Sequence, residues 1–352
     1  MVRFSEIIKV KGKKTSNKVM GEIKGREDKF RLSDSQVFKA REKAPAVKDE
    51  KPEKKNNKIE VTAYYDIFIE RAQDIRKRIQ ADMGISPSPV LSDLHAIIDK
   101  DLIDDLYEYA ISTGDEHDGM LIHTVDVTFT ALKVGKGMDY DVKKLLRLGL
   151  AAFLENVGMY KIPNNILETT RKLSEDEIRI IKSHPEKSHE ILLSLGERYG
   201  WLAETALKIH ERADGSGYPS GLKHDDIPEL ASVIGLVDTY IAMIKNRPYR
   251  DKFIQTDAIK SIIEASKGKF PSRIIKIFLN QITLFPVNSY IRLNNGSIGR
   301  VVATSKDKPL RPTIELLYDG SGKQLSSRQV IQLADNPLLY IDSSINADKI
   351  SG

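Results

Sequence analysis

The sequence predicts a mainly α-helical protein that ends in a small antiparallel β module. Between residues 59 and 284, apolar residues recur at helical spacing, and the stretches are separated by Gly, Pro and Asn. Beyond Phe285-Pro286 the spacing changes to alternation, and an Asn-Gly and an Asp-Gly pair separate the apolar runs. Such pairs are strong hairpin signals, because both residues tolerate the positive φ of tight turns.

The composition is that of a globular protein with room for more than one domain. The chain has 352 residues, of which 40% are hydrophobic and 30% charged. No apolar run is long enough to span a bilayer, and the N-terminus has no secretory apolar core. Because the chain contains no cysteine, we expect no disulfide, a cytoplasmic location, and metal ligands drawn from His and carboxylates.

Residues 1–58 are expected to form a basic, disordered tail. Residues 1–60 hold 18 Lys and Arg against 10 Asp and Glu, and few of them are aromatic. The run Ile7-Ile8-Lys9-Val10 has the pattern of one short strand. The charge fits an anionic partner such as nucleic acid or a membrane surface, so a structural role on nucleic acid is one hypothesis. A solvated tail that keeps the chain soluble is the simpler interpretation.

The apolar spacing in residues 59–115 predicts a lead-in module, that is, two helices that precede the main helical domain. The first carries an apolar stripe, with basic residues outside it, and ends in the Gly- and Pro-containing run 84–89. The stripe consists of Tyr64, Ile67, Phe68, Ala72, Ile75 and Ile79. A second helix is expected to follow, with apolar residues at suitable intervals at Leu94, Ile97, Ile98, Leu102 and Leu106. Both stripes are most simply core that faces the next domain.

Residues 116–284 predict a bundle of successive helices. Within it, Ser174 and Glu177 have the spacing of a capping box, which places a helix start just before Ile178. Residues 285–345 predict the β module, with strands on either side of Asn294-Asn295-Gly296 and a further strand before Asp319-Gly320.

The run from His210 to Pro219 is the most informative segment of the chain. It places an imidazole beside Glu211 and then adds the turn Gly215-Ser216-Gly217, which exposes Tyr218. A surface turn needs the glycines but has no use for the His-Glu pair. With its flanks, from about Met120 to Asn280, this run resembles the HD-GYP family, a branch of the HD phosphohydrolase fold linked to the bacterial second messenger cyclic di-GMP. The resemblance implies an HD-type helical bundle and a metal-dependent, phosphodiesterase-like site.

The resemblance implies that His123, His184, His210 and Asp238 are metal ligands. Taken singly, a lone His or Asp in an apolar helix is more simply a hydrogen-bonded core residue. Together the four match the family's ligand order, which favours a metal site. The remaining histidines fall outside that order, and we expect no ligand role for them: His95, His117, His189 and His224.

Three features depart from the family pattern. Glu155-Asn156 stands where a His-Asp doublet is expected, Met159 replaces a lysine, and Ile209 replaces the first of two consecutive histidines. Glu155 can still bind a cation through its carboxylate. The neutral amide of Asn156 cannot supply the charge that holds two dications close together. We therefore expect a reduced site that binds one Fe, Mn or other divalent ion, or none.

The ligand-facing segments keep more of the family pattern. The run Asn246-Arg247-Pro248-Tyr249-Arg250 resembles a segment that lies near the substrate's phosphates in the family. Arg247 and Arg250 are therefore expected to bind phosphate, with Tyr218 and Asp214 as further ligand contacts. Pairing of both arginines with carboxylates of the same domain, and simple packing of Tyr218, stay open as alternatives.

The leading hypothesis is a degenerate HD-GYP protein that acts in bacterial cyclic di-GMP signalling as a binding module with little or no hydrolysis. Its partner would be cyclic di-GMP, a related cyclic dinucleotide, or a signalling protein such as a diguanylate cyclase domain. The alternative is an active cyclic di-GMP phosphodiesterase, with one metal held by His123, Glu155, His210 and Asp238. Both a monomer and a dimer are compatible with the sequence.

Overall fold

The structure is a computed structural model that describes residues 57–112, 119–169, 171–244, 266–304 and 310–345, with positions 261, 262, 264 and 308. The strand signal at residues 7–10 and the arginines Arg247 and Arg250 lie outside these residues. Helix α3 (Asn57–Gln80) includes the last two residues of the predicted basic tail. The other predicted domain boundaries stay predictions.

The lead-in region contains three helices rather than the two predicted. Helix α3 buries Phe68, Ala72, Ile75 and Ile79 of the predicted stripe, whereas Tyr64 and Ile67 are half-buried. The predicted second helix is divided into α4 (Ser88–Asp99) and α5 (Ile103–Ser112).

A helix-ending turn at Asp101 causes this division. Asp101 adopts a left-handed φ of 52°, and its N–H donates to the Ile98 carbonyl. The N–H of Leu102 donates to the Ile97 carbonyl, which completes a Schellman motif and closes α4. Apolar spacing continues across this turn, so periodicity alone does not reveal it.

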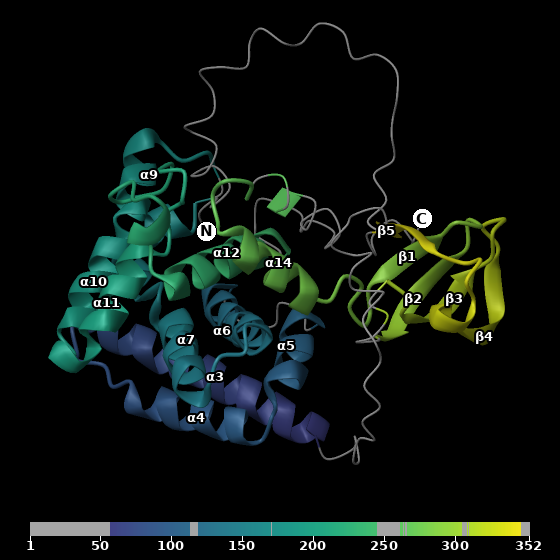
Figure 1. Ribbon diagram of the computed structural model, residues 1–352, viewed down its shortest axis with the longest axis horizontal. Helices are drawn as coiled ribbons and strands as arrows, with labels where there is room; N and C mark the ends of the chain where they lie inside the picture. Colours follow the sequence, from purple (N-terminus) through teal and green to yellow (C-terminus); the bar gives the residue numbers. More distant parts are fainter. Residues whose placement is uncertain are drawn as a thin grey trace, which may run out of the picture.

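Helix α6 (Gly119–Gly137) lies at the centre of the helical bundle (Figure 1). It contacts α3, α5, α7, α12 and α14. Every residue from Leu121 to Gly135 is buried, because a helix covered on all sides has no solvent-facing stripe. Its few polar side chains, including His123, are therefore held in the interior, where they need polar partners.

The remaining helices surround α6 or extend the bundle beyond α7. The predicted capping box is confirmed: the Ser174 hydroxyl accepts a hydrogen bond from the Glu177 N–H, and the Glu177 carboxylate accepts one from the Ser174 N–H. The α-helices are α7 (Val142–Leu154), α8 (Asn164–Leu167), α9 (Glu175–Lys182), α10 (His184–Leu193), α11 (Gly200–Lys208), α12 (Glu229–Ile244) and α14 (Ser272–Gln281). Short 3-10 turns occur at η2 (Val157–Lys161), η3 (Glu197–Tyr199), η4 (His224–Asp226) and η5 (Leu333–Asp335).

The C-terminal β module is a five-stranded antiparallel sheet, as predicted, in the order β4-β3-β2-β1-β5. The strands are β1 (Tyr290–Leu293), β2 (Ile298–Ala303), β3 (Thr313–Tyr318), β4 (Gln324–Gln332) and β5 (Ile341–Ile345). Both predicted turns join neighbouring strands, and Gly296 and Gly322 supply a positive φ in them. Ile291, Val301 and Ile314 belong to the same buried cluster as the helices.

None of the helices in the described part of the chain combines the length and the apolar character needed to cross a bilayer.

Candidate functional site

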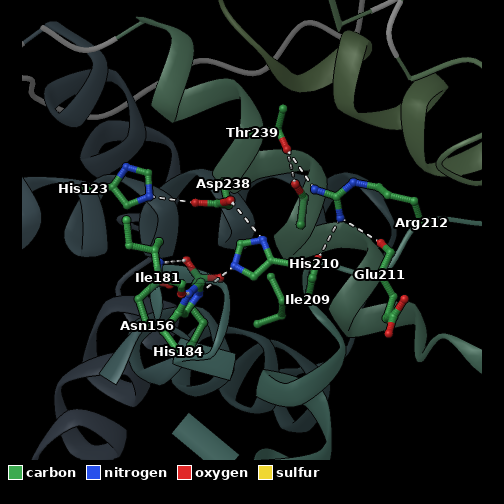
Figure 2. Close-up of polar contacts among 12 residues, drawn as sticks. His123, Asn156, Ile181, His184, Ile209, His210, Glu211, Arg212, Asp238 and Thr239 are labelled. Carbon is green, nitrogen blue, oxygen red and sulfur yellow. Dashed lines mark hydrogen bonds and ion pairs between the residues drawn. The ribbon is translucent and has the colours of Figure 1, made fainter. Parts of the chain in front are cut away.

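Two apolar helices that are distant in sequence bring His123 and Asp238 together. His123 lies on α6 and Asp238 on α12, and both side chains are buried. The Nε2 atom of His123 lies 2.8 Å from Oδ1 of Asp238 (Figure 2). Because a buried carboxylate is costly without polar partners, this contact explains how Asp238 is tolerated inside α12.

Glu155 and Asn156 occupy the bend that follows α7. Glu155 caps the C-terminus of α7, and Asn156 caps the 3-10 turn η2. The Asn156 amide nitrogen donates to Oε1 of Glu155 over 3.1 Å. The second carboxylate oxygen of Glu155, Oε2, and the amide oxygen of Asn156, Oδ1, are buried and accept no hydrogen bond from the protein. Because buried acceptors normally have a partner, a cation or another electropositive group would stabilise these two oxygens.

Close packing on α10 holds this bend in place. The hydroxyl of Ser188 donates to the Glu155 carbonyl and accepts from the Gly158 N–H, both over 2.8 Å. A Cβ at Gly158 would lie 2.1 Å from the His184 carbonyl oxygen. Only glycine therefore allows the bend to approach the N-terminus of α10, where His184 stands.

His184 and His210 form the second pair of the site. The Nε2 atoms of the two rings are 2.9 Å apart, and the rings meet edge to face (Figure 2). The Nδ1–H of His184 donates to the Ile181 carbonyl over 2.7 Å, which leaves Nε2 of His184 as an acceptor. Nδ1 of His210 lies 4.0 Å from Oδ2 of Asp238, beyond hydrogen-bond distance, so this pair is a neighbour of the His123–Asp238 pair.

Burial sets the charge of these groups. It lowers the pKa of His184 to about 4 and that of His210 well below its ordinary value, to which the neighbouring His184 also contributes. Both rings are therefore neutral near pH 7, which is the form that binds metals. Burial, together with the charge of Asp238, raises the pKa of Glu155 well above its ordinary value. A cation beside Glu155 would offset that penalty.

The loop after α11 places Tyr218 on the ring of His210. The two rings are stacked, with centroids 4.9 Å apart and an interplanar angle of 7°. The carboxylate of Glu211, which is 2% exposed, accepts hydrogen bonds from the N–H groups of Ser220, Gly221 and Leu222 over 2.7, 3.1 and 2.9 Å. Glu211 therefore faces away from the histidines and fixes the loop that carries Tyr218.

The side chain of Arg212 is fixed by backbone carbonyls of its own segment and by two residues from other elements. Its guanidinium donates to the carbonyls of Ile209 and Glu211 and to the hydroxyl of Thr239 (Figure 2). It also lies over the ring of Phe270. These contacts use the planar donor fork to fix the start of the loop against α12.

The residues that line the site fit a divalent cation. Ligand atoms of His123, Glu155 and Asp238 all lie within 4.8 Å of one another, and all three residues are buried. Two ligand atoms about 2.1 Å from one ion lie about 3 Å apart when they meet at a right angle. The His123–Asp238 and His184–His210 contacts have this spacing, which also suits a hydrogen bond. One imidazole and two carboxylates form a donor set for Fe, Mn or Zn.

The comparisons with known proteins agree with this fold. Residues 100–274 match the family model of the HD domain, and residues 290–352 match that of a KOW domain associated with HD domains. The chain is 27% identical over 223 residues to cyclic di-GMP phosphodiesterase PA4108 of Pseudomonas aeruginosa, covering 63% of this chain and 53% of that protein. It is 28% identical over 231 residues to cyclic di-GMP phosphodiesterase PdeB of Borreliella burgdorferi, covering 65% of this chain and 61% of that protein.

A solved structure shares the fold. It is Bd1817, an HDG"Y"P protein from Bdellovibrio bacteriovorus, with a TM-score of 0.54 and 14% identity, covering 69% of this chain and 75% of that chain. This chain is an HD-domain protein that is similar to the HD-GYP proteins. The matches extend over about half to three fifths of the length of the two phosphodiesterases.

The structure places two positions that depart from the HD-GYP pattern in apolar surroundings. Met159 is 3% exposed and packs with Ile162 and Ile181, and Tyr218 lies against this cluster. Ile209 is 1% exposed and belongs to the main core. Both side chains fill space that a lysine or a histidine would make polar.

The predicted ligand-facing residues are only partly described. Asp214 is exposed, and its carboxylate accepts hydrogen bonds from the N–H and the hydroxyl of Ser216, which are the contacts of a turn. Its role in ligand binding stays a prediction, as do the roles of Arg247 and Arg250 outside the described residues.

Two residues near the site, Ser188 and Lys182, were not singled out from the sequence. Ser188 and Gly158 join the bend at Glu155 to α10, and Lys182 lies over the ring of Tyr218. The only sequence signal for Lys182 is its position two residues before His184. Nothing local signals the contact between Ser188 and Gly158, because they belong to separate elements.

Proposed function

We propose that this chain binds a cyclic dinucleotide in bacterial cyclic di-GMP signalling, holds one divalent cation, and hydrolyses its ligand slowly at most. The observation that carries this proposal is the buried group of His123, Glu155 and Asp238, with an amide at Asn156 beside it. The relatives named as cyclic di-GMP phosphodiesterases support the ligand class. A cytoplasmic location belongs to the same proposal.

One cation is proposed rather than two because of the side chain at Asn156. Its amide nitrogen is directed to Glu155, and its oxygen carries no formal charge. Two dications close together repel each other strongly unless anionic oxygen lies between them. His123, Glu155 and Asp238 would hold the ion, while His184 and His210 form a neutral pair next to it.

Slow hydrolysis follows from what the chain itself supplies. A bound divalent ion polarises a phosphoryl oxygen and lowers the pKa of water. The chain would add the neutral rings of His184 and His210, which can accept a proton, and the buried surroundings that exclude bulk water. Met159 can neither donate a proton nor pair with phosphate. Arg247 and Arg250, as phosphate ligands, and a diguanylate cyclase domain, as a protein partner, remain parts of the proposal.

The second candidate function is an active phosphodiesterase with a reduced metal site. It is favoured by the names of the relatives and by the fit of the three-residue group to a cation. A nucleic-acid-binding role for the basic tail has only its charge in support, and a steep salt dependence that disappears on deletion of residues 1–58 would test it.

Binding and turnover of cyclic di-GMP by manganese- and iron-loaded protein separate the two candidates. Asp238→Ala is the control, because it removes a proposed ligand and the partner of His123. We expect calorimetric binding by the wild type, metal loss in the variant, and product formation no greater than in the variant. Multiple turnovers by the wild type that disappear in Asp238→Ala would establish the phosphodiesterase instead. Absence of binding in both would exclude the proposed function.

A further inference from the structure

The corner between α9 and α10 brings a lysine to the edge of the proposed site. Lys182 is the last residue of α9, and Ser183 alone separates it from His184 at the start of α10. The Nζ atom of Lys182 lies 5.2 Å from the centroid of the Tyr218 ring. That ring is stacked on His210, so an ammonium group, a tyrosine and a buried histidine follow one another from the rim of the site to its interior.

Burial increases from Lys182 and Tyr218 to the histidines. Lys182 and Tyr218 are half-buried, whereas His184 and His210 are 1% and 4% exposed. Lys182 is therefore more accessible to solvent than the two histidines are. Lysine carries three N–H donors on a flexible stem, so an ammonium that contacts a ring can also donate to phosphate oxygens.

The charges around the site favour a cation at this position. The interior contains the carboxyl groups of Glu155 and Asp238, whose two charges one bound dication would only balance, so the phosphates of a dinucleotide would still need a cation. The guanidinium of Arg212 is used by the carbonyls of its own segment. An anionic ligand gains most from positive charge at the rim, where desolvation of the lysine is least costly.

Lys182 and the apolar cluster that contains Met159 both lie against Tyr218. Met159 belongs to the apolar cluster that contains Ile181, and Tyr218 packs against this cluster. Lys182 directly follows Ile181 in the chain. Met159 therefore places an apolar side chain on η2, where the resemblance implies a lysine. Lys182 places a positive charge at the end of α9, beside Tyr218.

We propose that Lys182 is a phosphate-binding residue of this site and supplies from α9 the positive charge that Met159 lacks. The inference rests on the proposed function, because it requires an anionic ligand. The simpler alternative is a last-turn lysine that interacts with the C-terminal end of α9 and covers Tyr218. That role would affect folding but not ligand affinity.

The test is calorimetric binding of cyclic di-GMP to the full chain loaded with manganese, for wild type, Lys182→Met, Lys182→Arg and Lys143→Met. Lys143 is an exposed control at the start of α7, about 18 Å along the helix from Glu155 at 1.5 Å per residue. We expect Lys182→Met to bind at least about tenfold more weakly, which corresponds to about 1.4 kcal/mol. Lys182→Arg and Lys143→Met should stay within about twofold, and the affinity of Lys182→Met should depend less on salt.

The outcomes separate this inference from the proposed function. Equal affinity of the wild type and Lys182→Met would overturn the role of Lys182 and leave the proposed function in place. No binding by the wild type would overturn both. If Lys182→Met failed to fold, as judged by circular dichroism, Lys182→Arg and Lys182→Gln would replace it. Binding by Lys182→Gln as tight as by the wild type would then overturn the inference.

Discussion

Replacement of Glu211 by glutamine should release the loop that holds Tyr218 on His210. The carboxylate is buried and accepts hydrogen bonds from three successive N–H groups, two at Oε1 and one at Oε2. In Glu211→Gln one oxygen can keep the bonds from Ser220 and Gly221. The amide –NH₂ then faces the N–H of Leu222, so two donors oppose each other. Hydrogen bonds to a charged group contribute about 1.5–3 kcal/mol each, and we expect a local loss of about 3 kcal/mol.

Amide hydrogen exchange over the loop measures this loss directly. A local loss of about 3 kcal/mol corresponds to roughly a hundredfold faster exchange of the amides at positions 220–222. Glu190→Gln, an exposed change on α10, is the matched control and should leave exchange unchanged. Exchange of these amides in Glu211→Gln within about threefold of the wild type, a difference below about 1 kcal/mol, would refute the role assigned to Glu211.

Three further changes probe the site and its packing. Asn156→Asp should raise the bound metal from about one to about two ions per chain by elemental analysis, because it adds anionic oxygen beside Glu155; unchanged stoichiometry would contradict the one-cation proposal. Burial raises the pKa of Glu155, so the folded state holds this proton more tightly than the unfolded chain, and the stability of the metal-free protein falls as pH rises from the ordinary carboxyl range through the raised value. Metal-free Glu155→Gln should therefore be more stable than the wild type at pH 8 and similar at pH 4 in urea unfolding; equal stability at both would show that Glu155 carries no such penalty. Gly217→Ala would place a Cβ 2.4 Å from backbone atoms of Glu211 and Arg212 and should cost about 2 kcal/mol or more, whereas Gly84→Ala, with nothing within 4 Å of its Cβ, should not destabilise; similar unfolding midpoints would contradict the packing described for this loop.

Features encoded within a few residues could be predicted from the sequence. The capping box at Ser174, the hairpin turn at Gly296 and the buried stripe of α3 each depend on hydrogen bonds or on apolar spacing inside one segment. The break at Asp101 was missed although it is also local, because aspartate adopts a left-handed φ far less often than glycine and gives a weaker signal. The pairing of β5 with β1 could not be predicted, because the two strands lie at opposite ends of the module in the sequence and only the folded sheet brings them together.

For the candidate site too, the sequence predicted some features and only the structure showed the others. The sequence by itself determined which side chains are available: histidines and an aspartate in apolar helices, a glutamate and an amide after α7, and a methionine where the family has a lysine. It could not show that His123 meets Asp238, that His184 meets His210, or that Lys182 lies over Tyr218. Those contacts join residues 26 to 115 positions apart, in elements with no shared pattern. Only the packing of α6, α10 and α12 around one core decides which of their atoms meet, since burial forces polar groups inside it to pair with one another.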